Sequence, residues 1–236
     1  MNQTIAIVDA SVGETPAERN LTRSLDAETT VYKVSDERLP PVPAGGDWRY
    51  DGVVISGSQT SVYDDHDWMH DLTSWVRDVH RAGVPTLGIC WGHQFLAQSL
   101  GGRVVDMNEY ELGYRTVHRR DEDPLFADIS SSFTAFQTHS DRVAELPADA
   151  VELARNEYGI QAFRLGTRYG VQFHPEYDRE TAEWVIGNKD LTDERREAVT
   201  ATITDESVAA AQEATTVFEN FVRLVATHQR RPGRFD

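Results

Sequence analysis

The sequence predicts an α/β fold with a mostly parallel central sheet, helices on both faces and a small antiparallel section at one edge. Three observations predict it. Up to residue 100, short apolar runs alternate with segments of helical periodicity, which is typical of parallel strands joined by crossover helices. Between residues 103 and 173 the pattern changes to short, closely spaced strands. The remainder of the chain returns to helical patterns.

Each strand of the parallel part follows from an apolar run that ends in loop residues. The opening run, TIAIVDA, is apolar up to its aspartate, as expected for a buried strand that leads into a loop. Three further strands are expected in TTVYKV, YDGVVISGS and VPTLGIC. Because active sites in such folds lie at the carboxyl ends of the strands, the loops after these runs are the expected place for a site.

Two connecting segments carry clear helix signals. The first helix is expected in PAERNLTRSL, where Pro16 stands near the first turn. The second is expected in DWMHDLTSWVRDVHRAG, which has apolar residues at helical spacing and ends at Gly83. These helices provide the crossovers that a parallel sheet requires.

The second half of the chain divides into antiparallel strands and a helical extension. The expected strands are ELGYRTVHR, SFTAFQTH, AVELARN, IQAFRL and RYGVQF. Helical patterns follow in TAEWVIGNKD, LTDERREAVTATI and ESVAAAQEATTVFENFVRLVATHQ. The one plausible boundary lies near Lys189, so we expect an α/β domain at residues 1–188 and a C-terminal helical extension, 189–236, packed on the same domain.

The composition is strongly acidic, with 39 Asp and Glu against 23 Lys and Arg and a net charge of −16. Such a surface repels phosphate backbones, so nucleic acid is not an expected partner. We find no long apolar segment and no leader pattern, which predicts a cytoplasmic protein without a membrane partner. A composition with many acidic residues and only two lysines also resembles that of proteins from salt-loving organisms. An ordinary acidic protein from a GC-rich genome fits equally well.

The single cysteine, Cys90, stands between an apolar strand and an apolar helix. One cysteine excludes an internal disulfide and a multi-thiolate metal site. Gly88 and Gly92 flank it, as in a nucleophile elbow with Cys in place of Ser, where a sharp turn exposes the side chain at a helix N-terminus. That position favours the thiolate and directs the Trp91 amide toward an oxyanion. A core cysteine is the alternative, but the glycines favour a nucleophile.

A base for this thiol is expected in VQFHPEYD, directly after the apolar strand RYGVQF. Pro175 ends that strand, which leaves His174 at its carboxyl end and lets Glu176 turn back to hold the imidazole. Among the other histidines, His139 in QTHSDRV is the main rival. His80 and His93 lie on predicted helices, where we expect them to be exposed. No ligand spacing among the histidines recommends a metal site.

Together, GICWGHQ and FHPEY resemble the motifs of the class I glutamine amidotransferase family, in the branch that includes the amidotransferase domain of GMP synthase. The likeness covers residues 1 to about 185. It implies the flavodoxin-like architecture of that family and a triad of Cys90, His174 and Glu176. It also implies a γ-glutamyl thioester on Cys90, release of ammonia, and hydrolysis of the thioester by water activated at His174.

The resemblance extends to the substrate pocket. The family's loop with the second oxyanion donor is matched by ISGSQTSVYD, which implies the amide of Ser58, after Gly57, alongside that of Trp91. The family usually has Gly and Pro where this chain has Ser58 and Gln59. Gln94 matches a position that contacts the bound glutamine. The stretch that cradles the α-amino and carboxylate groups is matched by QTHSDRV, which implies His139, Ser140 and Asp141 as pocket residues.

We therefore expect a glutaminase or amidotransferase that releases ammonia from glutamine. The sequence has no synthetase domain and no GxxxxGK loop, so no cofactor is expected, and either a separate synthetase subunit receives the ammonia or the chain acts alone. Two alternatives stay open. One is a γ-glutamyl peptide hydrolase, because the same triad can cleave a γ-glutamyl bond with a larger leaving group; the other is a non-catalytic regulatory protein on the same scaffold.

Overall fold

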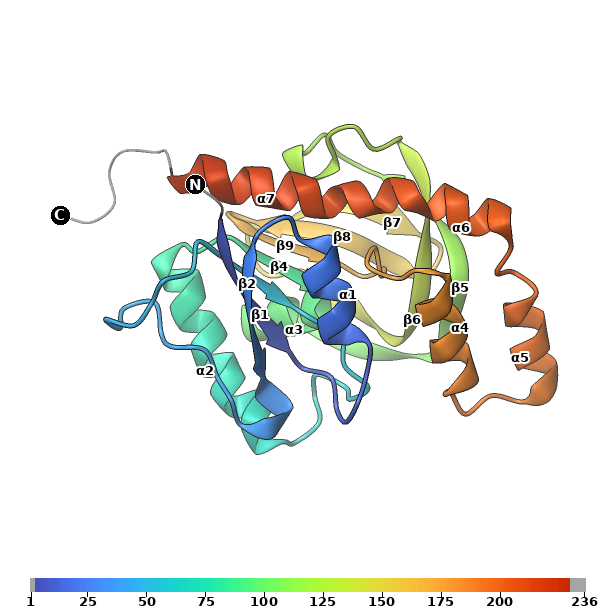
Figure 1. Cartoon of the computed structure of the whole chain (residues 1–236), viewed down its shortest axis with the longest axis horizontal. Helices are drawn as coiled ribbons and strands as arrows, with labels where there is room; N and C mark the ends of the chain where they lie inside the picture. The colour runs from blue at the N-terminus through green and yellow to red at the C-terminus, as the bar shows by residue number, and fades with distance from the viewer. Residues whose placement is uncertain (1–2, 230–236) are drawn as a thin grey trace.

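A computed structural model describes residues 3–229 of the chain, and Figure 1 shows a single sheet with helices around it. Within these residues nine strands form the sheet in the order β2-β1-β3-β4-β9-β8-β7-β5-β6. The strands are β1 (Thr4–Asp9), β2 (Glu28–Lys33), β3 (Gly52–Ile55), β4 (Thr86–Ile89), β5 (Arg103–Arg119), β6 (Ser132–Glu145), β7 (Val151–Asn156), β8 (Gly159–Leu165) and β9 (Arg168–Val171).

The helices follow the periodic segments of the sequence. They are α1 (Ala17–Ser24), α2 (Asp67–Ala82), α3 (Trp91–Ser99), α4 (Arg179–Gly187), α5 (Asp193–Thr200), α6 (Asp205–Ala211) and α7 (Thr216–Gln229). Pro16 caps the start of α1. Gly83 ends α2 in the left-handed conformation, with φ of 73°, which a residue without Cβ adopts at little cost.

The predicted α/β fold with a parallel centre and an antiparallel edge is confirmed. Strand β1 pairs in parallel with β2 and β3, and β4 pairs in parallel with β3 and β9. From β9 to β6 every pairing is antiparallel. The long strands β5 and β6, of 17 and 14 residues, make this section larger than the small edge section predicted. The carboxyl ends of β1, β3, β4 and β9 meet at one edge of the sheet, where the loops that carry the candidate residues begin.

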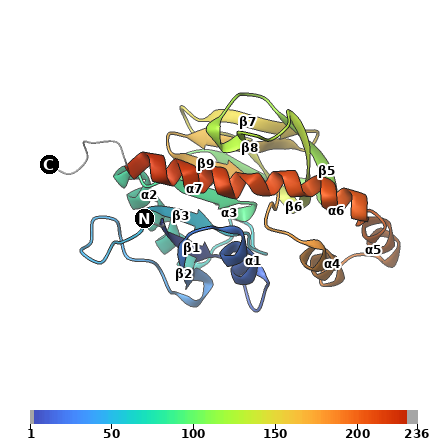
Figure 2. The same cartoon turned by 45° about the horizontal axis from the view of Figure 1, so that its top comes forward.

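Helices cover both faces of the sheet (Figures 1 and 2). On one face, Leu21 of α1 and Phe218 and Phe221 of α7 belong to the same buried core as β1, β4 and β9. On the other face, α2 and α3 pack with β3, with Trp75 and Phe95 at the centre. Burying each such side chain stabilises the fold by about 1.5–3 kcal/mol. Helix α7 therefore packs into the same core as β1, β4 and β9, although it follows these strands far along the chain.

The segment that joins α4 to α5 is held by one side chain, Arg196. Its guanidinium donates hydrogen bonds to four backbone carbonyl groups, those of Ile186, Gly187, Lys189 and Leu191, at 2.5–3.4 Å. Five N–H donors in a rigid fork make arginine suited to such a role. The loop thus has a fixed position beside the sheet edge. No helix within residues 3–229 is long and apolar enough to cross a membrane.

Candidate active site

The turn between β4 and α3 has the sharp geometry that its glycines predict. Cys90 has φ of 52° and ψ of −103°, a strained conformation for a residue with a side chain. A Cβ on Gly88 would lie 2.3 Å from the carbonyl oxygen of Gly92, and a Cβ on Gly92 would lie 2.4 Å from that of Ile55. Only glycine fits at either position, so the backbone passes closely enough to place Cys90 at the apex.

Cys90 is 5% exposed and lies at the N-terminus of α3. Its sulfur is 4.0 Å from the carbonyl oxygen of Thr138. The Trp91 amide occupies the first position of the helix, where no intrahelical acceptor exists and the helix dipole is positive. A Cβ on Gly57 would lie 3.8 Å from the Cβ of Cys90 and 3.1 Å from Cε1 of His174. The backbone that leads to Ser58 therefore passes close to Cys90 and to the ring of His174.

His174 is positioned by β6 and by the acidic residue two positions on. Its backbone N–H donates to the carbonyl oxygen of Phe136 at 2.9 Å, and its Nδ1 lies 2.8 Å from Oε1 of Glu176. The ring of Tyr177 stacks on the imidazole at a centroid distance of 4.1 Å. Glu176 thus fixes one ring nitrogen as a donor, and the other ring nitrogen is left for Cys90.

The surroundings of His174 favour its charged form. Burial alone would lower the pKa, but the charges of Glu176 and Cys90 and their hydrogen bonds outweigh it and raise the pKa of His174 to about 10. An imidazolium beside a thiol stabilises the thiolate. Burial, together with the negative charge of Glu176, also raises the pKa of Tyr177 well above its ordinary value, so Tyr177 stays neutral beside the imidazole.

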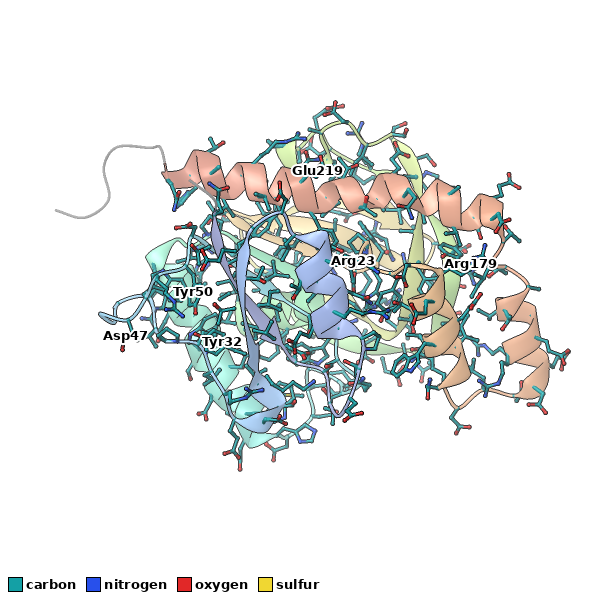
Figure 3. All side chains as sticks on the ribbon, viewed as in Figure 1. Arg23, Tyr32, Asp47, Tyr50, Arg179 and Glu219 are labelled. Carbon is teal, nitrogen blue, oxygen red and sulfur yellow. The ribbon has the colours of Figure 1, made fainter. Side chains whose placement is uncertain are left out.

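A second layer of contacts holds the turn that carries Glu176. Arg23 extends from α1 toward α4 (Figure 3), where it pairs with Asp178 and donates to the Glu176 carbonyl oxygen at 3.0 Å. Asp178 caps α4 by accepting from the Thr181 amide at 2.8 Å. Burial opposes the charge of Asp178, but the hydrogen bonds from Thr181 and Arg23 lower its pKa to about 2. Helix α1 thereby supports the position of Glu176.

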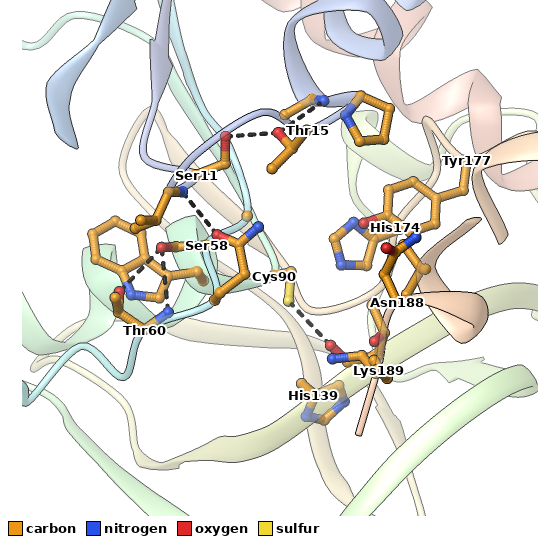
Figure 4. A pocket seen from close by; sticks show the side chains of 18 of the residues that line it. Ser11, Thr15, Ser58, Thr60, Cys90, His139, His174, Tyr177, Asn188 and Lys189 are labelled. Carbon is orange, nitrogen blue, oxygen red and sulfur yellow. Dashed lines mark hydrogen bonds between the residues drawn. The ribbon is translucent and has the colours of Figure 1, made fainter. Parts of the chain in front are cut away.

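All ten residues predicted from the sequence line one cavity of about 460 Å³ (Figure 4). These residues are Gly57, Ser58, Cys90, Trp91, Gln94, His139, Ser140, Asp141, His174 and Glu176. They come from separate stretches of the chain, which the fold brings to one edge of the sheet. Their chemical roles stay predictions. The cavity continues past His174 to residues of α4 and of the loop after it, among them Trp184, Asn188 and Lys189.

One wall of the cavity is fixed by Gln94 and Asp141. Nε2 of Gln94 donates to the Asp141 carbonyl oxygen at 2.9 Å and to Oε1 of Gln172 at 3.0 Å. The Asp141 carboxylate accepts from Ser61 Oγ at 2.7 Å and from Tyr63 Oη at 2.8 Å. Both bonds of Gln94 use its Nε2, so they fix the orientation of its amide group.

Glu111 was not predicted from the sequence. It is fully buried, with Oε2 2.8 Å from Nε2 of His139, and it accepts from Asn156 at 2.6 Å. Nδ1 of His139 lies 2.8 Å from the Asp141 carbonyl oxygen. Both ring nitrogens of His139 therefore face oxygen atoms, which fixes the orientation of the imidazole. A charged residue within an alternating strand pattern gives no sign of its partner, since the contact depends on the register that sets Glu111 opposite His139.

The expectation that His93 is exposed is wrong. It is fully buried on the side of α3 that faces the sheet, with its ring 5.1 Å from that of Phe163 and close to Gly170. Burial lowers the pKa of His93 to about 3, and a contact with the Gly170 backbone offsets only part of this effect. His80 is half-buried rather than exposed. Within residues 3–229 no group of three or more His, Cys, Asp or Glu side chains could hold a metal ion.

Comparison with solved structures supports the fold. The chain is similar to a glutamine amidotransferase from Thermotoga maritima, with a TM-score of 0.78, 22% identity and coverage of 94% of this chain and 99% of the other. A putative GMP synthase subunit from Thermoplasma acidophilum gives a TM-score of 0.70 at 23% identity, with coverage of 97% and 96%. At these identities the likeness shows the shared fold.

Sequence comparison gives the family. The chain is 37% identical over 133 residues to a GMP synthase [glutamine-hydrolyzing] of Aliivibrio fischeri strain MJ11, which covers 55% of this chain and 25% of the relative. A GMP synthase [glutamine-hydrolyzing] of Vibrio atlanticus is 38% identical over 129 residues, or 53% and 24% of the two chains. The chain thus spans about a quarter of the length of these relatives. The family model for class I glutamine amidotransferases matches residues 6–191. The chain belongs to the class I glutamine amidotransferase family.

Proposed function

We propose that the chain hydrolyses the side-chain amide of glutamine, with Cys90 as nucleophile and His174 and Glu176 as the other members of the triad. The observation that carries the proposal is the His174 to Glu176 contact of 2.8 Å beside a cysteine at the N-terminus of α3. A thiol needs a base to become a nucleophile, and the base needs a third group to orient it. Cys90, His174 and Glu176 are each only 4–5% exposed, which keeps most water away from these groups.

The first half of the reaction replaces the amide by a thioester. The Cys90 sulfur attacks the γ-carbonyl carbon, a C–S bond forms, and the carbonyl oxygen becomes an oxyanion that the amides of Ser58 and Trp91 stabilise. The C–N bond then breaks, and His174 gives its proton to the departing nitrogen, which leaves as ammonia. Glu176 keeps the imidazole in the tautomer and orientation that this transfer requires.

The second half releases glutamate. A water molecule gives one proton to His174 and adds to the thioester carbon, so that a C–O bond forms and the C–S bond breaks. The proton and the free thiolate restore the starting pair on Cys90 and His174. We place the glutamyl part of the substrate against the wall of Gln94, His139, Ser140 and Asp141, where buried polar groups meet a short polar substrate.

The test is ammonia release from glutamine by the purified chain. Cys90→Ala should lower kcat to background, because no other thiol is present. Intact-mass analysis of the wild type mixed with glutamine and quenched in acid should detect a γ-glutamyl adduct on Cys90, absent from the variant. Full activity in Cys90→Ala would show that another group is the nucleophile. No activity on any γ-glutamyl compound would favour a regulatory protein on this scaffold.

We further propose that a separate synthetase chain receives the ammonia. The similar relatives are named GMP synthases, and a solved structure of similar fold is named a putative GMP synthase subunit, which supports a synthetase as the acceptor of the ammonia. Adding a candidate synthetase with its acceptor substrate should raise the glutaminase rate and lower the free ammonia per glutamate formed. A thiolate nucleophile works under reducing conditions, which supports the cytoplasm as the compartment.

A second candidate function is the hydrolysis of γ-glutamyl compounds with leaving groups larger than ammonia. The observation that favours it is the extent of the cavity, which continues past His174 to Trp184, Asn188 and Lys189. The chemistry at Cys90 is the same in both cases. Comparison of kcat/KM for glutamine and for a γ-glutamyl dipeptide separates the two functions.

A further inference from the structure

We propose that Lys189 forms a binding site for a carboxylate on the leaving group of the substrate, so that γ-glutamyl amino acids with a free α-carboxylate are bound and cleaved in preference to their neutral amides. This proposal rests on the hydrolysis at Cys90 proposed above. It adds the chemical class of the leaving group and the residue that recognises it.

The mechanism places the leaving group on the side of His174. The departing nitrogen takes its proton from the imidazole, so any group attached to that nitrogen extends along the part of the cavity next to His174. Tyr177 stacks on this imidazole, and Tyr177 and Tyr110 pack around the same small core beneath α4 and α5. In Figure 4, His174, Tyr177, Asn188 and Lys189 lie to one side of Cys90, with Ser11 and Ser58 on the other.

A short chain of contacts connects Lys189 to the sulfur. Nζ of Lys189 lies 4.6 Å from the centre of the Tyr110 ring. The Tyr110 hydroxyl is 3.1 Å from Oγ1 of Thr138, whose carbonyl oxygen is 4.0 Å from the Cys90 sulfur. Lys189, Tyr110 and Thr138 all line the same cavity as Cys90.

Lys189 forms no ion pair with a carboxylate in the described part of the chain, although the sequence has 39 acidic residues. The other lysine, Lys33, shows the contrast, because its Nζ lies 3.0 Å from Asp9 and 2.6 Å from Ser11. A cation over an aromatic face keeps its charge available to a further partner. An ammonium group that faces a cavity without a protein counterion suits an anionic ligand.

Among the described residues, the acidic side chains that line the cavity form no ion pair with the ammonium group of Lys189. Glu176 is held by His174 and Asp141 by Ser61 and Tyr63, while Glu14 is exposed on the loop before α1. Arg196 fixes the loop that carries Lys189 by donating to backbone carbonyl groups of that loop. A site held in place before binding loses less conformational entropy when the ligand arrives.

The step balances in the same way as with glutamine. The sulfur forms a bond to the γ-carbonyl carbon, the C–N bond to the amino acid breaks, and His174 protonates the departing α-nitrogen. The amino acid leaves with its carboxylate intact, and water then hydrolyses the thioester to glutamate.

The experiment compares two substrates that differ only in their terminal group, the carboxylate of γ-glutamylglycine and the neutral carboxamide of γ-glutamylglycinamide. For the wild type we expect kcat/KM to favour the carboxylate by about tenfold or more, as for a charge-assisted contact. Lys189→Met should bring this ratio near one, and Lys189→Arg should keep most of it. Lys33→Met is the matched control and should leave the ratio unchanged. Each value is divided by the kcat/KM of the same variant for glutamine, so a general loss of activity cancels.

Binding to Cys90→Ala separates this proposal from the hydrolysis on which it rests. Isothermal titration of the two compounds into this variant requires no turnover, and the carboxylate should bind about tenfold more tightly than the amide. Two results would overturn the site. One is an equal preference for the carboxylate in Cys90→Ala and in the Cys90→Ala, Lys189→Met double variant. The other is equal affinity for the carboxylate and the amide in both variants. A Lys189-dependent preference without turnover by the wild type would support the site and overturn the hydrolysis.

Discussion

Nε2 of His139 lies 2.8 Å from the Glu111 carboxylate, and both side chains are almost fully buried. Burying polar groups costs free energy unless they find hydrogen-bond partners, so such a contact is stable only when the remaining polar atoms of both side chains are also paired. Asn156 and Gln161 donate to the same carboxylate, and the second nitrogen of His139 meets the Asp141 carbonyl oxygen. His139 lines the cavity beside Asp141, and the buried Glu111 supports His139 from behind.

Replacing Glu111 tests this pair. Glu111→Ala should lower the free energy of unfolding by about 1–3 kcal/mol, because it leaves buried nitrogen atoms of His139, Asn156 and Gln161 without their acceptor. Urea unfolding followed by tryptophan fluorescence measures the change. Glu109→Ala, at an exposed position of the same strand, is the control and should stay within about 0.5 kcal/mol of the wild type. A loss as small as that of the control would show that the contacts of Glu111 do not stabilise the fold.

The pH dependence of activity tests the contact between Glu176 and His174. The pKa of His174 is raised to about 10, so the imidazolium is present below that pH and is lost as the pH rises through it. Glu176→Gln removes a charge that raises this pKa, so the alkaline limb of kcat/KM should move to lower pH. The maximal rate should also fall by about 100-fold, as for the loss of an oriented base. An alkaline limb at the same pH in both proteins would contradict the assignment.

The sequence was sufficient to predict the parts of the site that depend on local backbone geometry. The glycines around Cys90 and the proline after His174 act through steric effects within a few residues, and these effects do not depend on the rest of the fold. The strand and helix pattern that brings both motifs to one sheet edge follows from periodicity alone. These features, with the family resemblance of the motifs, were enough for the fold and for ten of the residues that line the cavity.

The rest depends on contacts between distant segments. Glu111 faces His139 because a bulge between Asp106 and Glu111 shifts the β5 to β6 register, and nothing within the strand shows this shift. His93 is buried because its side of α3 faces β9, whereas a short helix that is apolar on most sides gives no clear inner face. Lys189 faces the cavity because Arg196, seven residues later, holds its loop.

Adding one methyl group to Gly88 tests the close approach at the turn. In Gly88→Ala the new Cβ would lie 2.3 Å from the Gly92 carbonyl oxygen, so the turn must open and Cys90 must shift. We expect loss of activity and a lower melting temperature, measured by circular dichroism and ammonia release. Gly187→Ala is the control, because its Cβ meets nothing within 4 Å at the end of α4. It should keep activity and gain about 0.5–1 kcal/mol from helix propensity.

Salt tests the origin of the acidic composition. The net charge of −16 destabilises the folded state by self-repulsion at low ionic strength. Raising KCl shortens the screening length from about 10 Å at 0.1 M to about 3 Å at 1 M. A protein adapted to high salt should continue to gain thermal stability in molar KCl, beyond the range in which screening is complete. A melting temperature that stays constant above about 0.5 M KCl would indicate an ordinary acidic protein.

His93→Leu should make stability less sensitive to acid. The pKa of His93 is lowered to about 3 in the folded state, against about 6.5 in an unfolded chain. Between these values the unfolded state binds a proton that the folded state does not, so the free energy of unfolding falls as the pH falls, by up to about 1.4 kcal/mol per pH unit. Urea unfolding is measured between pH 4.5 and 6.5, above the range in which the Asp178 carboxyl titrates. Its pKa is lowered to about 2 from 3.8. The variant should show a shallower slope, whereas equal slopes in the two proteins would mean that His93 is protonated in the folded state.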